Sequence, residues 1–89
     1  MKLRLVFLIK DETYGFRLRS SNKGHRIRNV VEGGIADLTG IKSGDRIIQV
    51  NGTSVKGSSH SEVVNMIRGS GEGVTLLLVD KQTDAHFKV

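Results

Sequence analysis

The segment Thr13–Leu18, which reads Thr-Tyr-Gly-Phe-Arg-Leu, is the strongest candidate for chemistry in this sequence. Gly15 leaves its backbone N–H unshielded and can adopt conformations that other residues avoid. Successive unshielded amides in a tight loop form a concavity that holds an anion. The residues after it alternate, so a strand would place Phe16 and Leu18 on one face and basic side chains on the other.

Two interpretations of this segment are open. An anion-holding turn that leads into a half-apolar strand suits capture of a polypeptide's terminal carboxylate, with the polypeptide added as a neighbouring strand. Taken alone, a tyrosine and a glycine at the mouth of a hairpin are more simply explained as ordinary turn chemistry. The rest of the chain has to decide between them.

The composition narrows the classes of function. The chain has 89 residues, enough for one domain with a modest core. No apolar run reaches 18 residues, so no membrane-spanning helix is predicted. The N-terminal residues alternate charged and apolar side chains without a cleavage site, so no signal peptide is expected. The absence of cysteine excludes disulfides and thiolate metal sites and favours a reducing cytoplasm.

The net charge favours acidic partners. Fourteen Lys and Arg residues face nine Asp and Glu residues, which gives a formal charge of +5. Nucleic acid is not expected, because the three Phe and one Tyr are not interleaved with the basic residues as stacking platforms.

Hydrophobic periodicity predicts mostly strands, with one short helix and one longer helix. The expected strands cover residues 3–9, 16–20, 26–31, 46–50 and 74–79, the last of them central because it is almost wholly apolar. Asn51-Gly52 is a strong hairpin-turn signal. The short helix covers residues 35–39 and ends at Gly40.

The longer helix begins near Ser58 or Ser59. If Ser59 is the N-cap, Glu62 completes a capping box. Its apolar face contains Val63, Val64 and Ile67, with Met66 as a further candidate, and a glycine-rich turn at residues 69–73 ends it.

Four segments agree in order and spacing with one known family. Tyr14–Leu18 resembles the carboxylate-binding loop of PDZ domains. Gly33–Gly40 is similar to their segment around a short helix, and Ser43–Gly52 is similar to their signature GD-x-I-x-x-V-N-G. His60–Ile67 resembles the start and body of the helix that flanks their ligand. The resemblance covers residues 3–79, nearly the whole chain.

Within that family, the chain looks most like the PDZ domains of the sodium–hydrogen exchanger regulatory factor (NHERF) group of multi-PDZ scaffolds. The resemblance rests on Tyr14–Phe16, His60–Val64 and the ending Leu76–Asp84. One departure is Ile35, which stands where the family often has proline.

The resemblance implies a mostly β fold with two helices. We expect a PDZ-like, partly open five- to six-stranded β-barrel or sandwich, capped by one short and one longer helix. It implies a PDZ domain over residues 1–80, followed by a polar C-terminal tail at residues 81–89.

The resemblance also implies a site. Backbone amides of Tyr14, Gly15 and Phe16 would hold a ligand carboxylate, with Lys10 assisting through water. The pocket for the last ligand side chain would be lined by apolar residues of the loop, strand and helix: Tyr14, Phe16, Leu18, Val64 and Ile67. The alternative is that these side chains only form part of the hydrophobic core, and we expect each of them to contribute to the core as well.

His60 would accept a hydrogen bond from a ligand Ser or Thr two residues before the last, the class I pattern Ser/Thr-x-hydrophobic. Without the resemblance, a lone His at a helix start is usually solvated. Arg17, Arg19 and Arg28 would contact acidic residues further upstream in the ligand, although strand arginines are commonly just a solvated face.

We therefore expect a non-catalytic scaffold module that needs no cofactor or metal and lies in the cytoplasm beneath the plasma membrane. Its partners would be the C-terminal tails of membrane transporters, channels or receptors. An enzyme is not indicated, because adjacent Ser58, Ser59 and His60 do not make a catalytic arrangement. The alternative is binding of anionic phospholipids, phosphoinositides included, through a basic cluster: Arg17, Arg19, Lys23, Arg26 and Arg28.

The chain is expected to be a monomer in dilute solution. Its last residue, Val89, is apolar and could enter a neighbour's groove at crystal-like concentrations. Phe87 would then face His60 and offer it no proton, so this contact should be weak.

Overall fold

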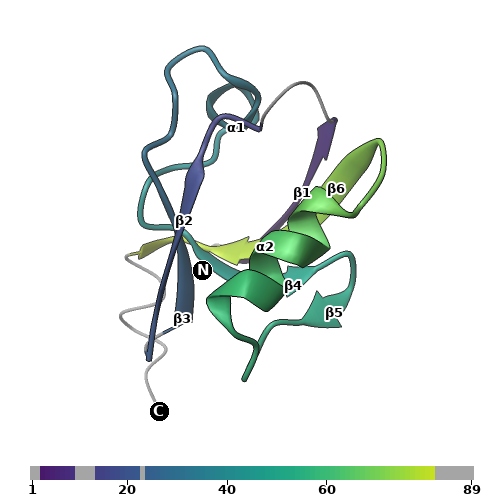
Figure 1. The fold of residues 1–89 in the computed structure, drawn as a ribbon. Coiled ribbons are helices and arrows are strands. Elements are labelled where there is room, and N and C mark those ends of the chain that lie inside the picture. Colours follow the sequence, from purple (N-terminus) through teal and green to yellow (C-terminus); the bar gives the residue numbers. More distant parts are fainter. Residues whose placement is uncertain (1–2, 10–13, 23, 82–89) are drawn as a thin grey trace.

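Antiparallel strands dominate the computed structural model, which describes residues 3–9, 14–22 and 24–81 (Figure 1). In chain order the elements are β1 (Leu3–Ile9), β2 (Arg17–Ser21), β3 (Gly24–Arg28), α1 (Ile35–Leu38), β4 (Arg46–Val50), β5 (Thr53–Ser54), α2 (His60–Arg68) and β6 (Gly73–Val79). The predicted fold class is confirmed: six antiparallel strands form a sheet that does not close, accompanied by one short and one longer helix.

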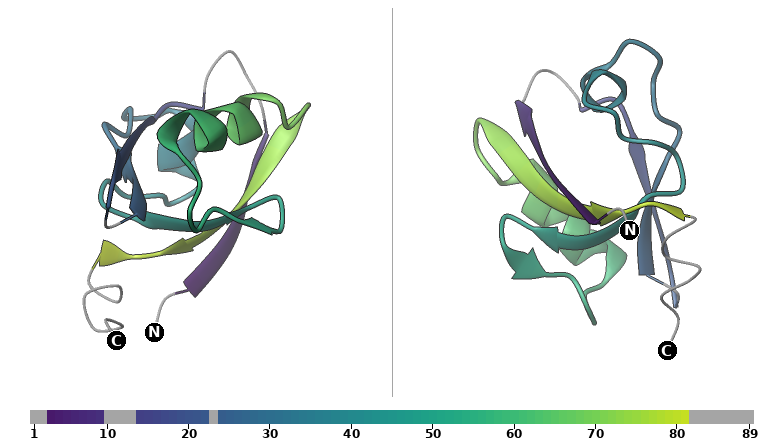
Figure 2. Two further views of the ribbon diagram at one scale, coloured as in Figure 1. Left: turned by 60° about the horizontal axis from the view of Figure 1, so that its bottom comes forward. Right: turned by 180° about the vertical axis from the view of Figure 1, so that it is seen from behind.

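The strand order β1-β6-β4-β3-β2 leaves β1 and β2 at opposite ends of the sheet, and β5 pairs only with β4. β6 lies between β1 and β4, which confirms that its apolar run is a central strand. The sheet curves, and α2 lies over β4 with β2 on one side and β6 on the other (Figure 2). The helix therefore occupies the open side of the curved sheet.

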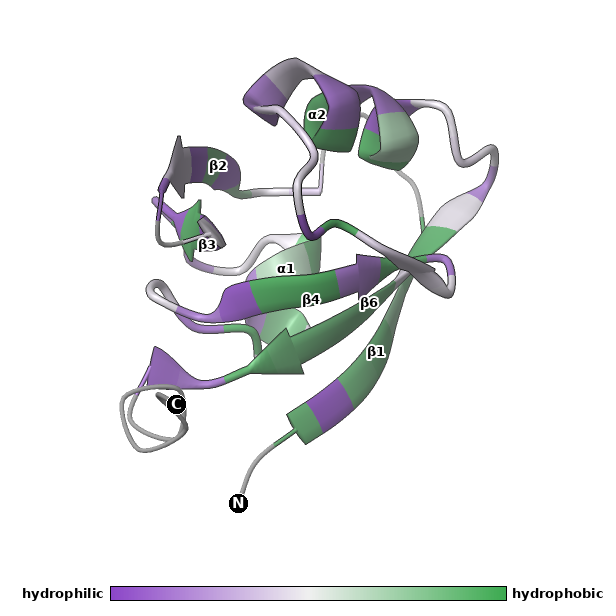
Figure 3. Cartoon of the chain, turned by 90° about the horizontal axis from the view of Figure 1, so that it is seen from below, coloured by the Kyte–Doolittle hydropathy of each residue, from purple (hydrophilic) through white to green (hydrophobic). Residues whose placement is uncertain are grey.

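The core lies between the sheet and α2. Its largest fully buried apolar side chains come from four strands, from α2 and from the loop after α1: Leu8, Ile27, Ile41, Ile47, Val50, Val63, Val74, Leu76 and Leu78. Figure 3 shows the hydrophobic side of α2 turned toward β4 and β6, with polar residues on the outer side. Each large aliphatic side chain buried in this way contributes about 1.5–3 kcal/mol.

The main differences from the predicted elements concern β3 and β5. The third strand ends at Arg28 and not at Val31, because Asn29 adopts a φ of 51°. Asparagine tolerates this left-handed conformation, which a continuing strand cannot contain. The two-residue strand β5 was not predicted. The Asn51-Gly52 turn is confirmed, with positive φ at both residues, as a type I′ hairpin turn requires.

A buried carboxylate joins β1 to the loop before β4. Asp45 is 1% exposed, forms an ion pair with Arg4 and accepts a hydrogen bond from the Lys42 backbone N–H at 3.0 Å. Arg4 also donates to the Gly40 carbonyl at 3.2 Å. These contacts satisfy a group that would be costly to bury alone.

The start of α2 is fixed by a capping box, with Ser59 as the N-cap. The Ser59 hydroxyl accepts from the Glu62 N–H at 3.1 Å, and the Ser59 N–H donates to the Glu62 carboxylate at 2.6 Å. The predicted cap is confirmed, and it makes His60 the first residue of the helix.

Several predictions concern residues outside the described part of the chain. Lys10, Lys23 and the tail residues 82–89 belong to this group. The domain boundary after residue 80 and the tail's contact with a neighbour therefore remain predictions. None of the helices in the described ranges has the length and apolar character needed to cross a membrane.

The capping box predicts an acid-sensitive part of the stability. Two hydrogen bonds from Ser59 lower the pKa of Glu62. The larger effect comes from the Ser59 backbone N–H and the smaller one from the Ser59 side chain. A lowered folded-state pKa stabilises the fold above the unfolded value, about 4.3, and this contribution is lost as the pH falls through the folded pKa. Glu62→Gln should therefore be less stable than wild type at pH 6, with the gap closing toward pH 2.5.

Urea denaturation at several pH values measures this gap. Glu72→Gln, at an exposed glutamate in the α2–β6 turn, is the matched control and should leave the difference from wild type small at every pH. A Glu62→Gln difference that stays constant from pH 6 to pH 2.5 would contradict the role of the ionised carboxylate.

Candidate binding site between β2 and α2

β2 is an edge strand beside a helix. Among the described strands it pairs only with β3, in a register that places Leu18 opposite Ile27 and Ser20 opposite His25. Its other side faces α2 (Figure 2). An edge strand presents backbone donors and acceptors that can pair with another chain. The space between β2 and α2 is therefore the natural place for an extended segment to dock.

The loop before β2 is held in place by hydrogen bonds to two of its carbonyl groups. The Gly15 carbonyl accepts from the Val31 N–H at 2.8 Å, and the Tyr14 carbonyl accepts from the Ala36 N–H at 3.0 Å. Gly15 has a φ of 77°, which strongly favours glycine. A Cβ at Gly15 would lie 3.4 Å from the Gly34 Cα, so the loop also packs closely on the segment before α1.

The apolar residues predicted to line the pocket divide into two groups. Tyr14 and Ile67 are buried, with 8% and 7% of their surface exposed, and they belong to the core. Phe16, Leu18 and Val64 are half-buried. The rings of Tyr14 and Phe16 have centroids 6.4 Å apart. Phe16 and Leu18 pack against the core that contains Tyr14 and Ile67, and Val64 is a half-buried residue of α2.

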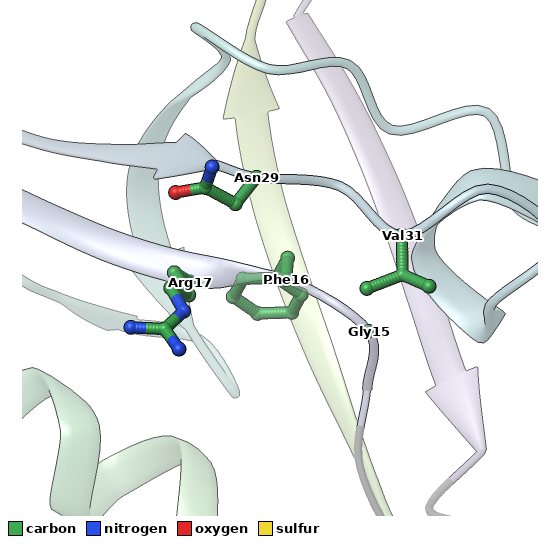
Figure 4. A pocket seen from close by; sticks show the side chains of 5 residues that line it. All are labelled: Gly15, Phe16, Arg17, Asn29 and Val31. Atoms are coloured by element: carbon green, nitrogen blue, oxygen red, sulfur yellow. The ribbon is translucent and has the colours of Figure 1, made fainter.

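A pocket of about 510 Å³ lies at the start of β2 and is lined by Gly15, Phe16, Arg17, Asn29 and Val31 (Figure 4). Asn29 and Val31 come from the segment after β3, and no residue of α2 lines it. This pocket includes two residues of the predicted carboxylate loop. It does not include Leu18, Val64 or Ile67, so it is not the predicted pocket for a ligand side chain.

A chain of hydrogen bonds joins β2, β3 and the start of α2. His60 Nδ1 lies 2.8 Å from the Ser20 hydroxyl, and that hydroxyl lies 2.7 Å from His25 Nδ1. His25 Nε2 lies 2.9 Å from the Ser58 carbonyl oxygen. His25 is only 6% exposed, whereas His60 is exposed. The network holds the Nδ1 edge of the His60 ring and does not use its Nε2.

His25 and Ser20 were not singled out from the sequence. Their contact follows from the register of the β2–β3 hairpin, in which Ser20 is directly opposite His25. The signal was present in principle, because side chains directly opposite on neighbouring strands share a face. Using it requires the connection between β2 and β3 to be placed correctly.

Arginines face each other across three strands. Arg17 is opposite Arg28, Arg19 is opposite Arg26, and Arg26 is also opposite Arg46. Arg17 and Arg19 are exposed, and Arg26 donates to the Gly44 carbonyl at 3.1 Å. The predicted basic cluster is therefore one continuous surface in its described members, extended by Arg46.

A sequence profile of the PDZ domain matches residues 5–79. This chain belongs to the PDZ domain family. The profile spans all six strands and both helices except the first two residues of β1, so the whole described fold is that of a PDZ domain.

Two curated relatives are Na(+)/H(+) exchange regulatory cofactors NHE-RF2. The mouse protein is 46% identical over 77 residues, which is 84% of this chain and 23% of that protein. The rabbit protein is 43% identical over 91 aligned residues, covering 99% of this chain and 29% of that protein. This chain thus spans about a quarter of the length of these relatives. The predicted likeness to the NHERF group of PDZ domains is confirmed.

A solved structure is also similar: the PDZ domain of choanoflagellate SHANK1 bound to a GIRK3 peptide. It superposes with a TM-score of 0.79 at 32% sequence identity, over 88% of this chain and 92% of that one. That PDZ domain is a peptide binder, and its likeness extends over nearly all of this fold.

Proposed function

We propose that this PDZ domain is a non-catalytic module that captures the free C-terminus of partner proteins. The ligand adds as a strand to β2, on the side that faces α2. The observation that carries this proposal is that β2, beside α2, pairs with β3 alone among the described strands and is preceded by the tightly held Gly15 loop. The similarity to a PDZ domain solved with a peptide supports it.

The terminal carboxylate binds at the loop of Tyr14, Gly15 and Phe16. Charge-assisted hydrogen bonds from backbone amides are short and about twice as strong as neutral ones. The positive φ of Gly15 and the backbone bonds to Val31 and Ala36 hold the loop in one conformation before the ligand arrives. Such preorganisation lowers the entropy cost of binding. Lys10, which is outside the described residues, would assist through water.

An apolar last residue of the ligand fits the half-buried surfaces of Phe16, Leu18 and Val64. Phe16 and Leu18 pack against the core that contains Tyr14 and Ile67. Burying a valine or leucine of the ligand here removes apolar surface from water on both partners. This apolar surface therefore selects a hydrophobic final residue.

His60 reads the ligand residue two positions before the last. It is the first residue of α2, and its Nδ1 is already occupied by Ser20. Its other ring nitrogen can accept from a Ser or Thr hydroxyl, which gives the class I preference Ser/Thr-x-hydrophobic.

Arg17, Arg19 and Arg28 favour acidic side chains upstream of these positions. Arg17 and Arg28 are direct cross-strand neighbours, so one ligand carboxylate could meet both. Exposed pairs of this kind contribute about 0–1 kcal/mol each and are weakened by salt. They tune the choice of ligand more than its affinity.

The partners in this proposal are C-terminal tails of membrane transporters, channels or receptors. The named relatives are regulatory cofactors of Na(+)/H(+) exchange, and the similar solved domain holds a GIRK3 peptide. We place the module in the cytoplasm beneath the plasma membrane, as one part of a longer scaffold. Its own contribution is binding and not catalysis.

A second candidate function is binding of anionic phospholipids. It is favoured by the arginines that lie opposite one another across β2, β3 and β4, called here the arginine ladder: Arg17, Arg19, Arg26, Arg28 and Arg46. Each basic residue near an anionic membrane contributes about 1 kcal/mol. Arg19→Gln with Arg28→Gln should then reduce co-sedimentation with phosphoinositide vesicles, whereas Lys56→Gln, at an exposed turn, should not. Association that is unchanged in the double variant would exclude the cluster as a lipid site.

The carboxylate loop predicts that peptides ending in Ser/Thr-x-Leu/Val/Ile bind and that their C-terminal amides bind far less. Gly15→Ala should weaken binding of the free acids by at least about 10-fold, because an L-residue at this φ costs about 1–2 kcal/mol and shifts the loop. Gly52→Ala is the matched control, since Gly52 has a φ of 80° in the distant β4–β5 turn. Fluorescence anisotropy with acid and amide peptides measures both effects; equal affinity for the two would refute the proposal.

His60→Ala should cost about 1–2 kcal/mol of binding free energy for peptides with Ser or Thr two positions before the last. Peptides with valine at that position should lose less, because they make no such hydrogen bond. Titration calorimetry near pH 8, where histidine side chains are ordinarily neutral, separates the two cases. Ser61→Ala, at the next residue of the helix, is the control. A loss that is the same for both peptides would mean that His60 only shapes the helix.

A further inference from the structure

In the hydrogen-bond chain from Ser58 to His60, the Ser58 carbonyl determines which atom donates and which accepts at each step. The Ser58 carbonyl oxygen only accepts, so His25 Nε2 at 2.9 Å must donate. In the described part of the chain, both ring nitrogens of His25 have neutral partners, and the ring is 6% exposed. Histidine side chains are ordinarily neutral near pH 8. A neutral ring with its proton on Nε2 has only a lone pair on Nδ1.

Ser20 links the protonation of His25 to that of His60 on α2. Its single hydroxyl proton points to His25 Nδ1 at 2.7 Å, so toward His60 the hydroxyl offers only a lone pair. The short 2.8 Å contact with His60 Nδ1 is a hydrogen bond only if that nitrogen carries the proton. The tautomer of a histidine is set in this way by the bond that its other nitrogen makes.

We infer that Ser20 and His25 are positioning residues that hold the His60 proton on Nδ1 and so make Nε2 a hydrogen-bond acceptor. Neither residue needs to touch the ligand for this role. His25 acts from the interior, on the far side of Ser20 from His60.

The consequence for specificity rests on the proposed function. An acceptor at Nε2 suits the hydroxyl of Ser or Thr, which can donate, and opposes the carboxylate of Asp or Glu, which only accepts. A hydroxyl can also accept, so it tolerates either tautomer. The discrimination of Thr against Asp at this ligand position is therefore the property that the positioning residues control.

The first test reads the tautomer in the free protein, without any peptide. Long-range ¹H–¹⁵N NMR spectra at pH 8 distinguish a protonated ring nitrogen from an unprotonated one. Wild type should show His60 protonated on Nδ1 and His25 protonated on Nε2. Ser20→Ala removes the acceptor from His60 Nδ1–H, and it should raise the fraction of His60 protonated on Nε2.

Two substitutions of His25 separate direction from packing. His25→Leu removes the acceptor for the Ser20 hydroxyl, which can then donate to His60 Nδ1 and move the His60 proton to Nε2. His25→Gln retains an acceptor for Ser20 and a donor for the Ser58 carbonyl, so it should preserve the wild-type tautomer. Ser61→Ala is the control for serine loss on α2 and should change nothing. His60 protonated on Nε2 in wild type, or the same His60 tautomer in wild type, Ser20→Ala and His25→Leu, would overturn the inference.

The second test measures binding of two peptides that end in Thr-x-Val and Asp-x-Val. The affinity ratio of Thr to Asp should fall about fivefold in Ser20→Ala and His25→Leu, the size of one hydrogen bond, and should be kept in His25→Gln. A ratio that does not change in Ser20→Ala would overturn the positioning role. If wild type has the inferred tautomer but binds no peptide, the proposed function is wrong and the assignment of the tautomer stands.

Discussion

The structure depends on α2 covering the core without pairing with the edge of β2. A helix satisfies its backbone hydrogen bonds internally, so it can bury Val63 and Ile67 against the curved sheet and leave the neighbouring strand edge to another chain. A seventh strand in the same place would cover the core equally well and would consume that edge. Because a helix stands at this position, β2 remains an edge strand of the described sheet, as the proposed strand addition requires.

The same helix has to present its first residue at a defined point. The capping box of Ser59 and Glu62 fixes where α2 begins, and the bond from His60 to Ser20 fixes how its first turn faces β2. Each contact is modest alone, about 1 kcal/mol for an N-cap or a hydrogen bond. Together they join a local signal in the sequence to a contact between residues that are 40 positions apart. The site is therefore built from weak contacts that agree in direction.

The features that could be predicted are those determined by short, local stretches of sequence. Alternation gave most strands, helical spacing gave the face of α2, and Ser59 with Glu62 gave its start. The end of β3 could not be placed, because it depends on Asn29 taking a left-handed conformation. The Arg4–Asp45 pair and the role of His25 were also missed. Both join distant residues, and neither residue type is unusual in its local sequence. The site residues were supplied by resemblance to a family, while their network is particular to this chain's three-dimensional contacts.

The arginine ladder lowers the stability of the sheet through repulsion between like charges. Like charges directly opposite on neighbouring strands destabilise a sheet, yet Arg17 faces Arg28 and Arg19 faces Arg26. Part of this cost is offset where an arginine finds a carbonyl, as Arg26 does at Gly44. The remaining positive field lies along β2, which pairs with β3 alone among the described strands. An extended acidic segment added there would relieve the repulsion and gain main-chain bonds in the same step, so the charge that weakens the isolated sheet favours the same event that its open edge allows.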